Sequence, residues 1–171
     1  DRILLWCLYN EPSNKNKGAN TLPLLREVFD WARDINPTQP LTATIRGGSL
    51  NEMDCFLLEN CDVITFHSYE SIDAVKPKVQ LYKDFGRPVV CTEYMAPKGS
   101  TFGAILPFFQ SERIGAISFG LVAGKGNFQY PWGSKEGSPE PAIWFHDIFR
   151  NDGAPYDINE VRLIKELSKG N

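Results

Sequence analysis

The chain has 171 residues, of which 42% are hydrophobic, enough to build one packed core and too few for two domains of ordinary size. Its formal net charge is −3, and its Lys and Arg residues are scattered rather than clustered, which argues against nucleic acid or a membrane surface as a partner. No apolar run approaches the roughly 20 residues of a membrane-spanning helix, and no signal-peptide pattern opens the chain. We therefore expect one domain over residues 1–171, and secreted, periplasmic and cytoplasmic locations all fit the sequence.

Five short apolar stretches, rich in β-branched residues, predict β-strands. They cover residues 3–8, 41–45, 63–66, 88–92 and 114–122. Several are apolar on both faces, which is typical of parallel strands that are covered on both sides. We expect the first of them to be anchored in a packed sheet.

Helix-like segments lie between and after these strands, at residues 22–35, 51–59, 74–85, 102–110 and 141–150. The clearest is 22–35, where apolar residues recur at steps of three and four. Pro107 weakens the prediction for 102–110, because proline is costly inside a helix. The stretch 123–140 has no such pattern, and its length and three aromatic residues favour a functional loop.

The alternation of strands and helices predicts right-handed βαβ units. Both an open doubly wound sheet and part of a (β/α)8 TIM barrel fit this order. A complete barrel needs eight strands and about 250 residues. If the fold is a barrel, the chain holds its C-terminal part.

The four cysteines show neither a CxxC pair nor a nearby histidine at a spacing that suits zinc. Cys7 and Cys91 lie inside apolar runs, so we interpret the cysteines as buried free thiols. No metal-ligand spacing is found among the acidic residues either, and we expect no metal and no cofactor.

Two glutamates follow two of the predicted strands directly. Glu11 follows the first strand in "LLWCLYNEPS", and Glu93 ends the fourth in "VVCTEY". Ligands bind at the C-terminal ends of parallel strands both in open sheets and in barrels. A close pair of carboxyl groups divides naturally into one acid and one anion, as glycoside hydrolysis requires.

The motif "YNEP", residues 9–12, resembles the Asn-Glu-Pro signature after the fourth strand in the clan of retaining glycoside hydrolases with (β/α)8 barrels. "CTEY", residues 91–94, is similar to the nucleophile motif after the seventh strand, and two predicted strands lie between the two motifs. "FHSYE", residues 66–70, resembles the His-x-Tyr element of the sixth strand. The resemblance therefore implies a TIM barrel of which this chain holds strands 4 to 8.

The resemblance also implies a role for each matching residue in hydrolysis of a poly- or oligosaccharide. Glu11 would be the general acid and base, and Glu93 the nucleophile. The remaining residues would bind substrate or position the nucleophile, and these are Asn10 on the sugar 2-hydroxyl, Tyr69 on Glu93, His67 in the same pocket, and Phe119 and Trp132 against the sugar. Phe119 stands where many relatives carry tryptophan, and Trp132 is a candidate substitute. A retaining mechanism predicts carboxyl groups about 5 Å apart.

A second hypothesis is a non-catalytic carbohydrate-binding or barrel-assembly fragment, whose partner would be the missing N-terminal half of the barrel. An esterase-like hydrolase is disfavoured, because the sequence contains no G-x-S-x-G nucleophile elbow. Arg46, after the second predicted strand, is a weaker candidate for the site. His146 is interpreted as a core or surface residue of the last predicted helix.

Overall fold

The computed structural model describes residues 2–14, 18–46, 50–97 and 99–169. Its contacts divide the chain into two compact units, each of which is described here by itself. Unit 1 comprises Asp1–His67 and Lys76–Thr92, and unit 2 comprises Ser68–Val75 and Glu93–Asn171. One helix and one strand run across the boundary, and the single domain over residues 1–171 stays a prediction.

Four parallel strands of unit 1 are paired in the order in which they occur in the sequence. Strands β1 (Trp6–Cys7) and β2 (Leu41–Thr42) are paired in parallel. A parallel bridge between Ile45 and Phe66 joins the segment after β2 to β3 (Ile64–His67). Strand β4 (Val89–Glu93) pairs with β3. The predicted strands 3–8, 41–45, 63–66 and 88–92 are therefore confirmed, although the first two are shorter than expected.

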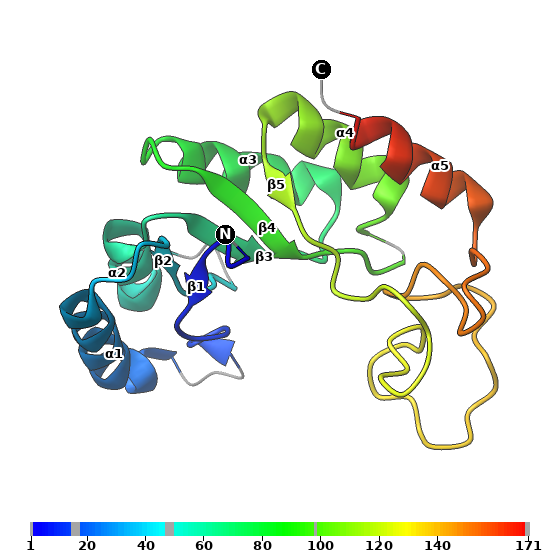
Figure 1. Ribbon diagram of the computed structural model, residues 1–171, viewed down its shortest axis with the longest axis horizontal. Coiled ribbons are helices and arrows are strands. Elements are labelled where there is room, and N and C mark those ends of the chain that lie inside the picture. Colours follow the sequence, from blue (N-terminus) through cyan, green and yellow to red (C-terminus); the bar gives the residue numbers. More distant parts are fainter. Residues whose placement is uncertain (1, 15–17, 47–49, 98, 170–171) are drawn as a thin grey trace. The chain divides into compact units, whose positions relative to one another are not determined.

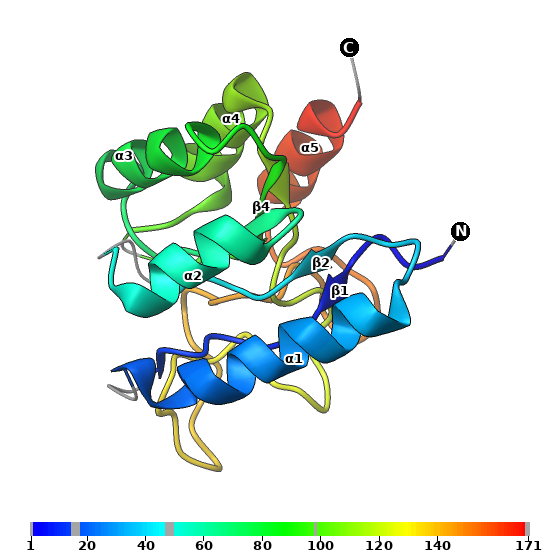
Figure 2. The same ribbon diagram turned by 90° about the vertical axis from the view of Figure 1, so that its left-hand side faces the viewer.

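The helices of unit 1 follow from their caps and apolar spacing (Figure 2). A short 3-10 turn (Gly18–Thr21) leads into α1 (Leu22–Ile35), which has proline in its first turn and ends at Asn36 in the left-handed region. Helix α2 (Glu52–Asn60) begins where the Asn51 side chain accepts a hydrogen bond from the backbone N–H of Asp54. The Phe29 and Phe56 rings pack edge to face with centroids 5.6 Å apart, which holds α1 against α2.

Helix α3 (Ile72–Lys83) crosses from unit 2 into unit 1 and packs on β3 through the rings of Tyr82 and Phe66, whose centroids are 5.2 Å apart. It contains Pro77 in its interior. Burial of residues such as Val75, Val79 and Tyr82 offsets the cost of that proline, about 3 kcal/mol.

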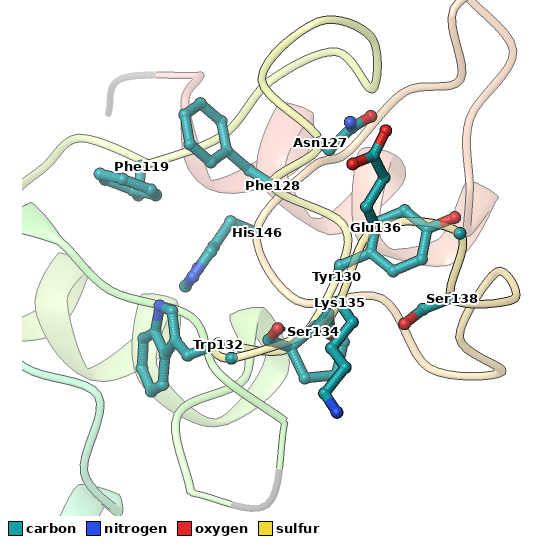
Figure 3. Close-up of a pocket in the computed structure, with 13 residues that line it drawn as sticks. Phe119, Asn127, Phe128, Tyr130, Trp132, Ser134, Lys135, Glu136, Ser138 and His146 are labelled. Atoms are coloured by element: carbon teal, nitrogen blue, oxygen red, sulfur yellow. Dashed lines mark hydrogen bonds between the residues drawn. The ribbon is translucent and has the colours of Figure 1, made fainter.

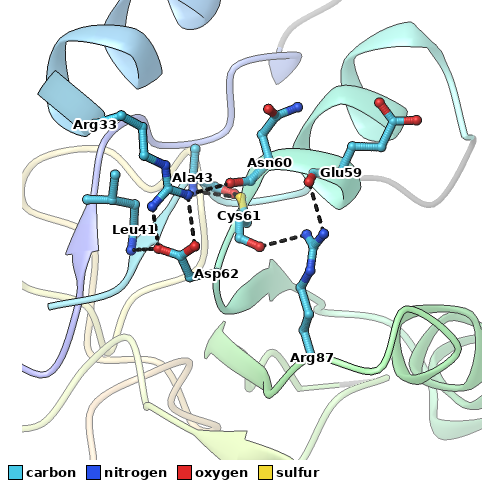
Figure 4. A network of polar contacts seen from close by, with 8 residues as sticks. All are labelled: Arg33, Leu41, Ala43, Glu59, Asn60, Cys61, Asp62 and Arg87. Carbon is cyan, nitrogen blue, oxygen red and sulfur yellow. Dashed lines mark hydrogen bonds and ion pairs between the residues drawn. The ribbon is translucent and has the colours of Figure 1, made fainter. Parts of the chain in front are cut away.

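A polar network fixes the end of α2 and the start of β2 (Figure 4). Arg33 donates two hydrogen bonds of 2.8 Å to the Asp62 carboxylate, which also accepts the backbone N–H of Leu41 at 2.8 Å. The hydrogen bonds from Arg33 hold the pKa of Asp62 below its usual range. Arg87 donates to the carbonyl oxygens that end α2, which belong to Leu58, Glu59 and Cys61.

The first strand is not buried in unit 1 as the sequence suggested. Leu4 is 73% exposed, and Ile3 and Trp6 are each 43% exposed. Within unit 1, β1 pairs with β2 on one side, so the packing that an internal strand receives from two neighbours is missing. Cys7 and Cys55 are both exposed, so the prediction of buried thiols is wrong for these two and confirmed for Cys61 and Cys91. All four cysteines are free, as predicted.

Unit 2 combines α4 (Phe102–Glu112), the short strand β5 (Gly115–Ala116) and α5 (Ile158–Leu167) with a long irregular segment (Figure 1). Helices α4 and α5 lie side by side. Three apolar side chains of α4, Phe102, Ile105 and Phe109, are buried, and their burial offsets the cost of Pro107. The helix predicted at residues 102–110 is confirmed, whereas α5 was not predicted.

The helix predicted at residues 141–150 is wrong. The backbone N–H groups of Phe145 and His146 donate to the carbonyl oxygens of Gln129 and Phe128, and the chain meets Val122 again in a parallel bridge at Phe149. These backbone hydrogen bonds to a distant segment therefore override the helical pattern of residues 141–150. The strand predicted at residues 114–122 is reduced to β5 and that single bridge. No helix among the described residues is long and apolar enough to cross a membrane.

Candidate active site

Glu11 lies at the C-terminal end of β1 in a polar setting within unit 1. Its side chain is 11% exposed. Its Oε1 lies 2.7 Å from Nδ1 of His67, which ends β3, and its Oε2 lies 3.3 Å from Nε of Arg46. Asn14 donates a further hydrogen bond to Oε2. The ends of three parallel segments thus converge on one carboxyl group.

The backbone of Glu11 is itself unusual, because its φ is +46°. A residue with a Cβ atom rarely adopts this left-handed region, and such strain is concentrated at functional sites. His67 is nearly inaccessible, with 3% of its side chain exposed, whereas the Arg46 side chain is 51% exposed and has room to move. The structure therefore brings the predicted site residues Glu11 and His67 together and adds Arg46, which the sequence marked only as a weaker candidate.

Asn10, the residue before Glu11, is exposed. It is placed at the same strand end as the carboxyl group, where a ligand could meet its amide. Its predicted role on a sugar 2-hydroxyl stays a prediction.

Glu93 ends β4, and its carboxylate lies in unit 2 beside Tyr69. The Tyr69 hydroxyl donates a hydrogen bond of 2.7 Å to Glu93 Oε2. The backbone N–H of Ser68 donates to the Glu93 carbonyl oxygen at 3.0 Å, so the pairing that continues past β3 sets Tyr69 next to this strand end. The predicted contact between Tyr69 and Glu93 is present in the structure.

Aromatic rings pack against the ring of Tyr69. The ring centroids of Tyr69 and Trp132 are 4.8 Å apart, and those of Tyr69 and His146 are 5.4 Å apart. Phe119 packs against His146 with centroids 5.0 Å apart. The predicted substrate-binding residues Phe119 and Trp132 therefore belong, with Tyr69, to one cluster centred on His146.

The cluster forms part of the wall of a cavity of about 680 Å³ in unit 2 (Figure 3). Phe119, Phe128, Trp132 and His146 supply apolar and aromatic surface, and a turn that contains Ser134 and Lys135 supplies polar surface. The volume falls in the range of small-molecule sites, roughly 300 to 1,000 Å³. The loop at residues 123–140, predicted to be functional, provides most of this wall.

His146, interpreted from the sequence as a core or surface residue, is buried at the wall of this cavity. It is 1% exposed, and its Nδ1 lies 2.6 Å from the carbonyl oxygen of Met95. Because a carbonyl oxygen can only accept, Nδ1 carries the hydrogen. Burial lowers the pKa of His146 and so favours the neutral ring. Its place at the cavity follows from the pairing of residues 145 and 146 with 128 and 129, which no local pattern signals.

The candidate residues thus form two groups, each within one unit. Glu11, His67 and Arg46 belong to unit 1, and Glu93, Tyr69 and the aromatic cluster belong to unit 2. The pairing of the two carboxyl groups stays a prediction. Glu11 and His67 are residue types that also bind metals, and the absence of a metal stays a prediction.

Comparisons with known proteins identify related folds. A β-glucuronidase of Paenibacillus borealis is 30% identical over 106 residues, which cover 55% of this chain and 17% of that protein. The structure of a Faecalibacterium prausnitzii β-glucuronidase matches 98% of this chain and 32% of its own, with a TM-score of 0.66 and 13% identity. The crystal structure of CbXyn10B in native form matches 90% of this chain and 60% of its own, with a TM-score of 0.54 and 12% identity.

No family model matches the sequence. The structural matches confirm the α/β fold class and a relationship in fold to TIM-barrel glycoside hydrolases. The chain spans about a sixth of the curated relative and about a third of the first structure. The closed barrel and the residue roles stay predictions.

Proposed function

We propose that this chain carries the two catalytic carboxyl groups of a retaining β-glycosidase that hydrolyses a poly- or oligosaccharide. The observation that carries the proposal is the hydrogen bond of 2.7 Å from Tyr69 to Glu93 at the end of a parallel strand. The relationship in fold to glycoside hydrolases and the β-glucuronidase name of the curated relative support it. The proposal requires the carboxyl groups of Glu11 and Glu93 to lie about 5 Å apart.

Glu93 would be the nucleophile. Its Oε atom would bond to the anomeric carbon of the sugar while the bond from that carbon to the leaving oxygen breaks. The hydroxyl of Tyr69 would hold the carboxylate in one orientation during this attack. Positioning of this kind matters, because a misplacement of about 1 Å can cost on the order of a hundredfold in rate.

Glu11 would give a proton to the leaving oxygen in the first step and take one from the attacking water in the second. The second step would break the bond between Glu93 and the sugar. The sugar would then be released with its original anomeric configuration. His67, held 2.7 Å from Glu11, would fix the orientation of the acid. The positive charge of Arg46 would attract the Glu11 carboxylate whenever Glu11 is ionised.

Asn10, Phe119 and Trp132 would bind the substrate. The amide of Asn10 would contact the sugar 2-hydroxyl, and the two aromatic rings would pack against sugar faces, with Trp132 60% exposed and Phe119 37% exposed. No metal takes part in the proposed chemistry.

The proposal is tested by covalent trapping. The full chain is incubated with 2-deoxy-2-fluoro β-glycosides of several sugars, including a β-glucuronide because of the relatives' name. The 2-fluoro group slows both steps, and a good leaving group such as fluoride keeps the first step faster than the second, so the covalent intermediate accumulates and peptide mass mapping locates it. A label on Glu93 supports the proposal and identifies the accepted sugar, whereas a label on any other residue overturns it.

A second candidate function is favoured by one observation, the exposed apolar side chains in β1 and in the segment just before it. Ile3, Leu4 and Trp6 present a surface that a further strand-bearing segment could cover. The chain would then act as one part of a barrel that another segment completes, or as a carbohydrate-binding part. Measurement of the mass in solution together with turnover of chromogenic β-glycosides separates the two functions, because a folded monomer that does not turn over favours the second.

A further inference from the structure

The second ring nitrogen of His146 is buried and has no hydrogen-bond partner among the described residues. A buried polar atom without a partner costs about 1 to 3 kcal/mol, so such atoms are rare in folded proteins. His146 lines the cavity of unit 2, and Figure 3 shows its ring reaching from the wall toward Trp132. An unpaired nitrogen at the wall of a cavity indicates that a bound ligand supplies its hydrogen-bond partner.

The chemistry of this atom is fixed by the other side of the ring. Nδ1 donates its hydrogen to the carbonyl oxygen of Met95 at 2.6 Å. Nε2 of the neutral ring therefore has a lone pair and no hydrogen, and it can accept a hydrogen bond but cannot donate one. The missing partner must be a donor, such as a hydroxyl group.

We propose that Nε2 of His146 accepts a hydrogen bond from a hydroxyl group of a sugar bound in this cavity. The inference rests on the proposed function and adds to it a residue that positions the sugar. Sugars combine apolar C–H faces, which pack on aromatic rings, with hydroxyl donors. The wall offers both kinds of partner, because Phe119 and Trp132 pack against the His146 ring that carries the acceptor nitrogen, and Phe128 packs against Phe119.

The Trp132 side chain must move before a sugar can reach Nε2 of His146. Nε2 is closed off from solvent, and the rings in contact with His146 include Tyr69, Phe119 and Trp132. Tyr69 is held by its hydrogen bond to Glu93, whereas Trp132 is 60% exposed and has free space on its outer side. A turn of the Trp132 side chain would open Nε2 to the cavity and leave the indole ring beside the sugar.

The test uses the full chain with its histidines labelled with ¹⁵N, titrated with the methyl β-glycosides of glucose, xylose and glucuronic acid. The sequence contains two histidines, and the spectrum of His146→Asn assigns the signals of each. We expect one of these sugars to shift the Nε2 resonance of His146 in a saturable way. If none of the three sugars shifts it, the inference is overturned.

Two variants separate binding from folding. His146→Asn keeps an N–H group near the Met95 carbonyl oxygen and removes the acceptor in the cavity, so we expect unchanged thermal unfolding and about tenfold weaker sugar binding. Trp132→Ala should also weaken binding. Trp31→Ala should not, and it is the matched control because Trp31, in α1 of unit 1, is 56% exposed. Binding by His146→Asn as tight as that of the unchanged protein would overturn the inference.

Failure of this inference and failure of the proposed function give different results. A label on Glu93 from a sugar that leaves the His146 resonance unchanged would keep the function and overturn the role of His146. A saturable shift at His146 without any covalent label on Glu93 would keep the sugar site and overturn the retaining mechanism.

Discussion

The two candidate catalytic glutamates occupy contrasting surroundings. Glu11 lies among polar and ionisable groups, with His67, Arg46 and Asn14 in contact with its carboxyl oxygens. Glu93 accepts a hydrogen bond from Tyr69, whose ring belongs to an aromatic cluster. One glutamate thus lies among ionisable groups, and the other contacts a tyrosine whose ring belongs to an aromatic cluster. Under the proposed function, Glu11 would be the acid and base and Glu93 the nucleophile.

The largest effect is expected from Glu11→Gln, which removes the proton donor and keeps the shape of the side chain. With a poor leaving group we expect kcat/KM to fall about 10² to 10⁴-fold, and with an activated leaving group that needs no proton the fall should be far smaller. Steady-state kinetics with aryl β-glycosides of graded leaving-group acidity measures the difference.

Glu140→Gln is the control for this variant, because Glu140 also pairs with an arginine, Arg150, at 3.0 Å but lies outside the proposed machinery. It should leave both classes of substrate unchanged. An equal loss on good and poor leaving groups in Glu11→Gln would contradict the role of Glu11 as the acid.

A smaller effect is expected from Tyr69→Phe, which keeps the ring packed on Trp132 and removes the hydrogen bond to Glu93. A hydrogen bond to a charged group contributes about 1.5 to 3 kcal/mol, so we expect kcat to fall roughly 10 to 100-fold. Tyr156→Phe is the matched control, because its hydroxyl donates to the Ala142 carbonyl oxygen at 2.8 Å instead. Equal activities of the two variants would remove Tyr69 from the mechanism.

The smallest effect is expected from Asp62→Asn. Asp62 stabilises the fold through its hydrogen bonds and takes no part in the proposed chemistry. Asn keeps an acceptor for the Leu41 N–H and loses the charge that faces Arg33. Both side chains of the pair are more than a third exposed, so we expect the free energy of unfolding at pH 7 to fall by only about 0.5 to 1 kcal/mol.

The pH dependence of this effect has a definite sign. The pKa of Asp62 is lowered in the folded protein, so the stabilisation is complete above the ordinary aspartate pKa of about 3.9 and is lost as the pH falls through the folded value. Urea unfolding of the two proteins should therefore differ at pH 7, and the difference should shrink as the pH is lowered further below about 3.9. A difference that does not change with pH would assign the effect to packing rather than charge.

The sequence predicted best what local pattern and strand order determine. Helix α1 has the predicted bounds, and Glu93 ends its strand as expected, because alternation and capping are local properties. The sequence analysis placed Glu11 and His67 in one pocket but not in contact, because the two residues follow β1 and β3, and the β2 segment lies between these strands.

Other features depend on tertiary contacts that the sequence does not display. The segment that contains His146 has a helical pattern, yet its backbone pairs with residues 121–129, and only that pairing brings the ring to the cavity. The positive φ of Glu11 has no glycine or asparagine to signal it. The exposure of β1 depends on which segments pack beside the strand. The apolar residues of β1 itself carry no information about those segments.

Met95 connects two parts of the proposed machinery through the backbone. It has a φ of +79°, its carbonyl oxygen holds His146, and it lies two residues after Glu93. A residue held in this region has little room to relax, because any change in its dihedral angles moves the carbonyl group and the strand end together. Under the two proposals, a sugar bound to His146 would therefore be joined to the Glu93 strand end through one hydrogen bond and two residues of backbone.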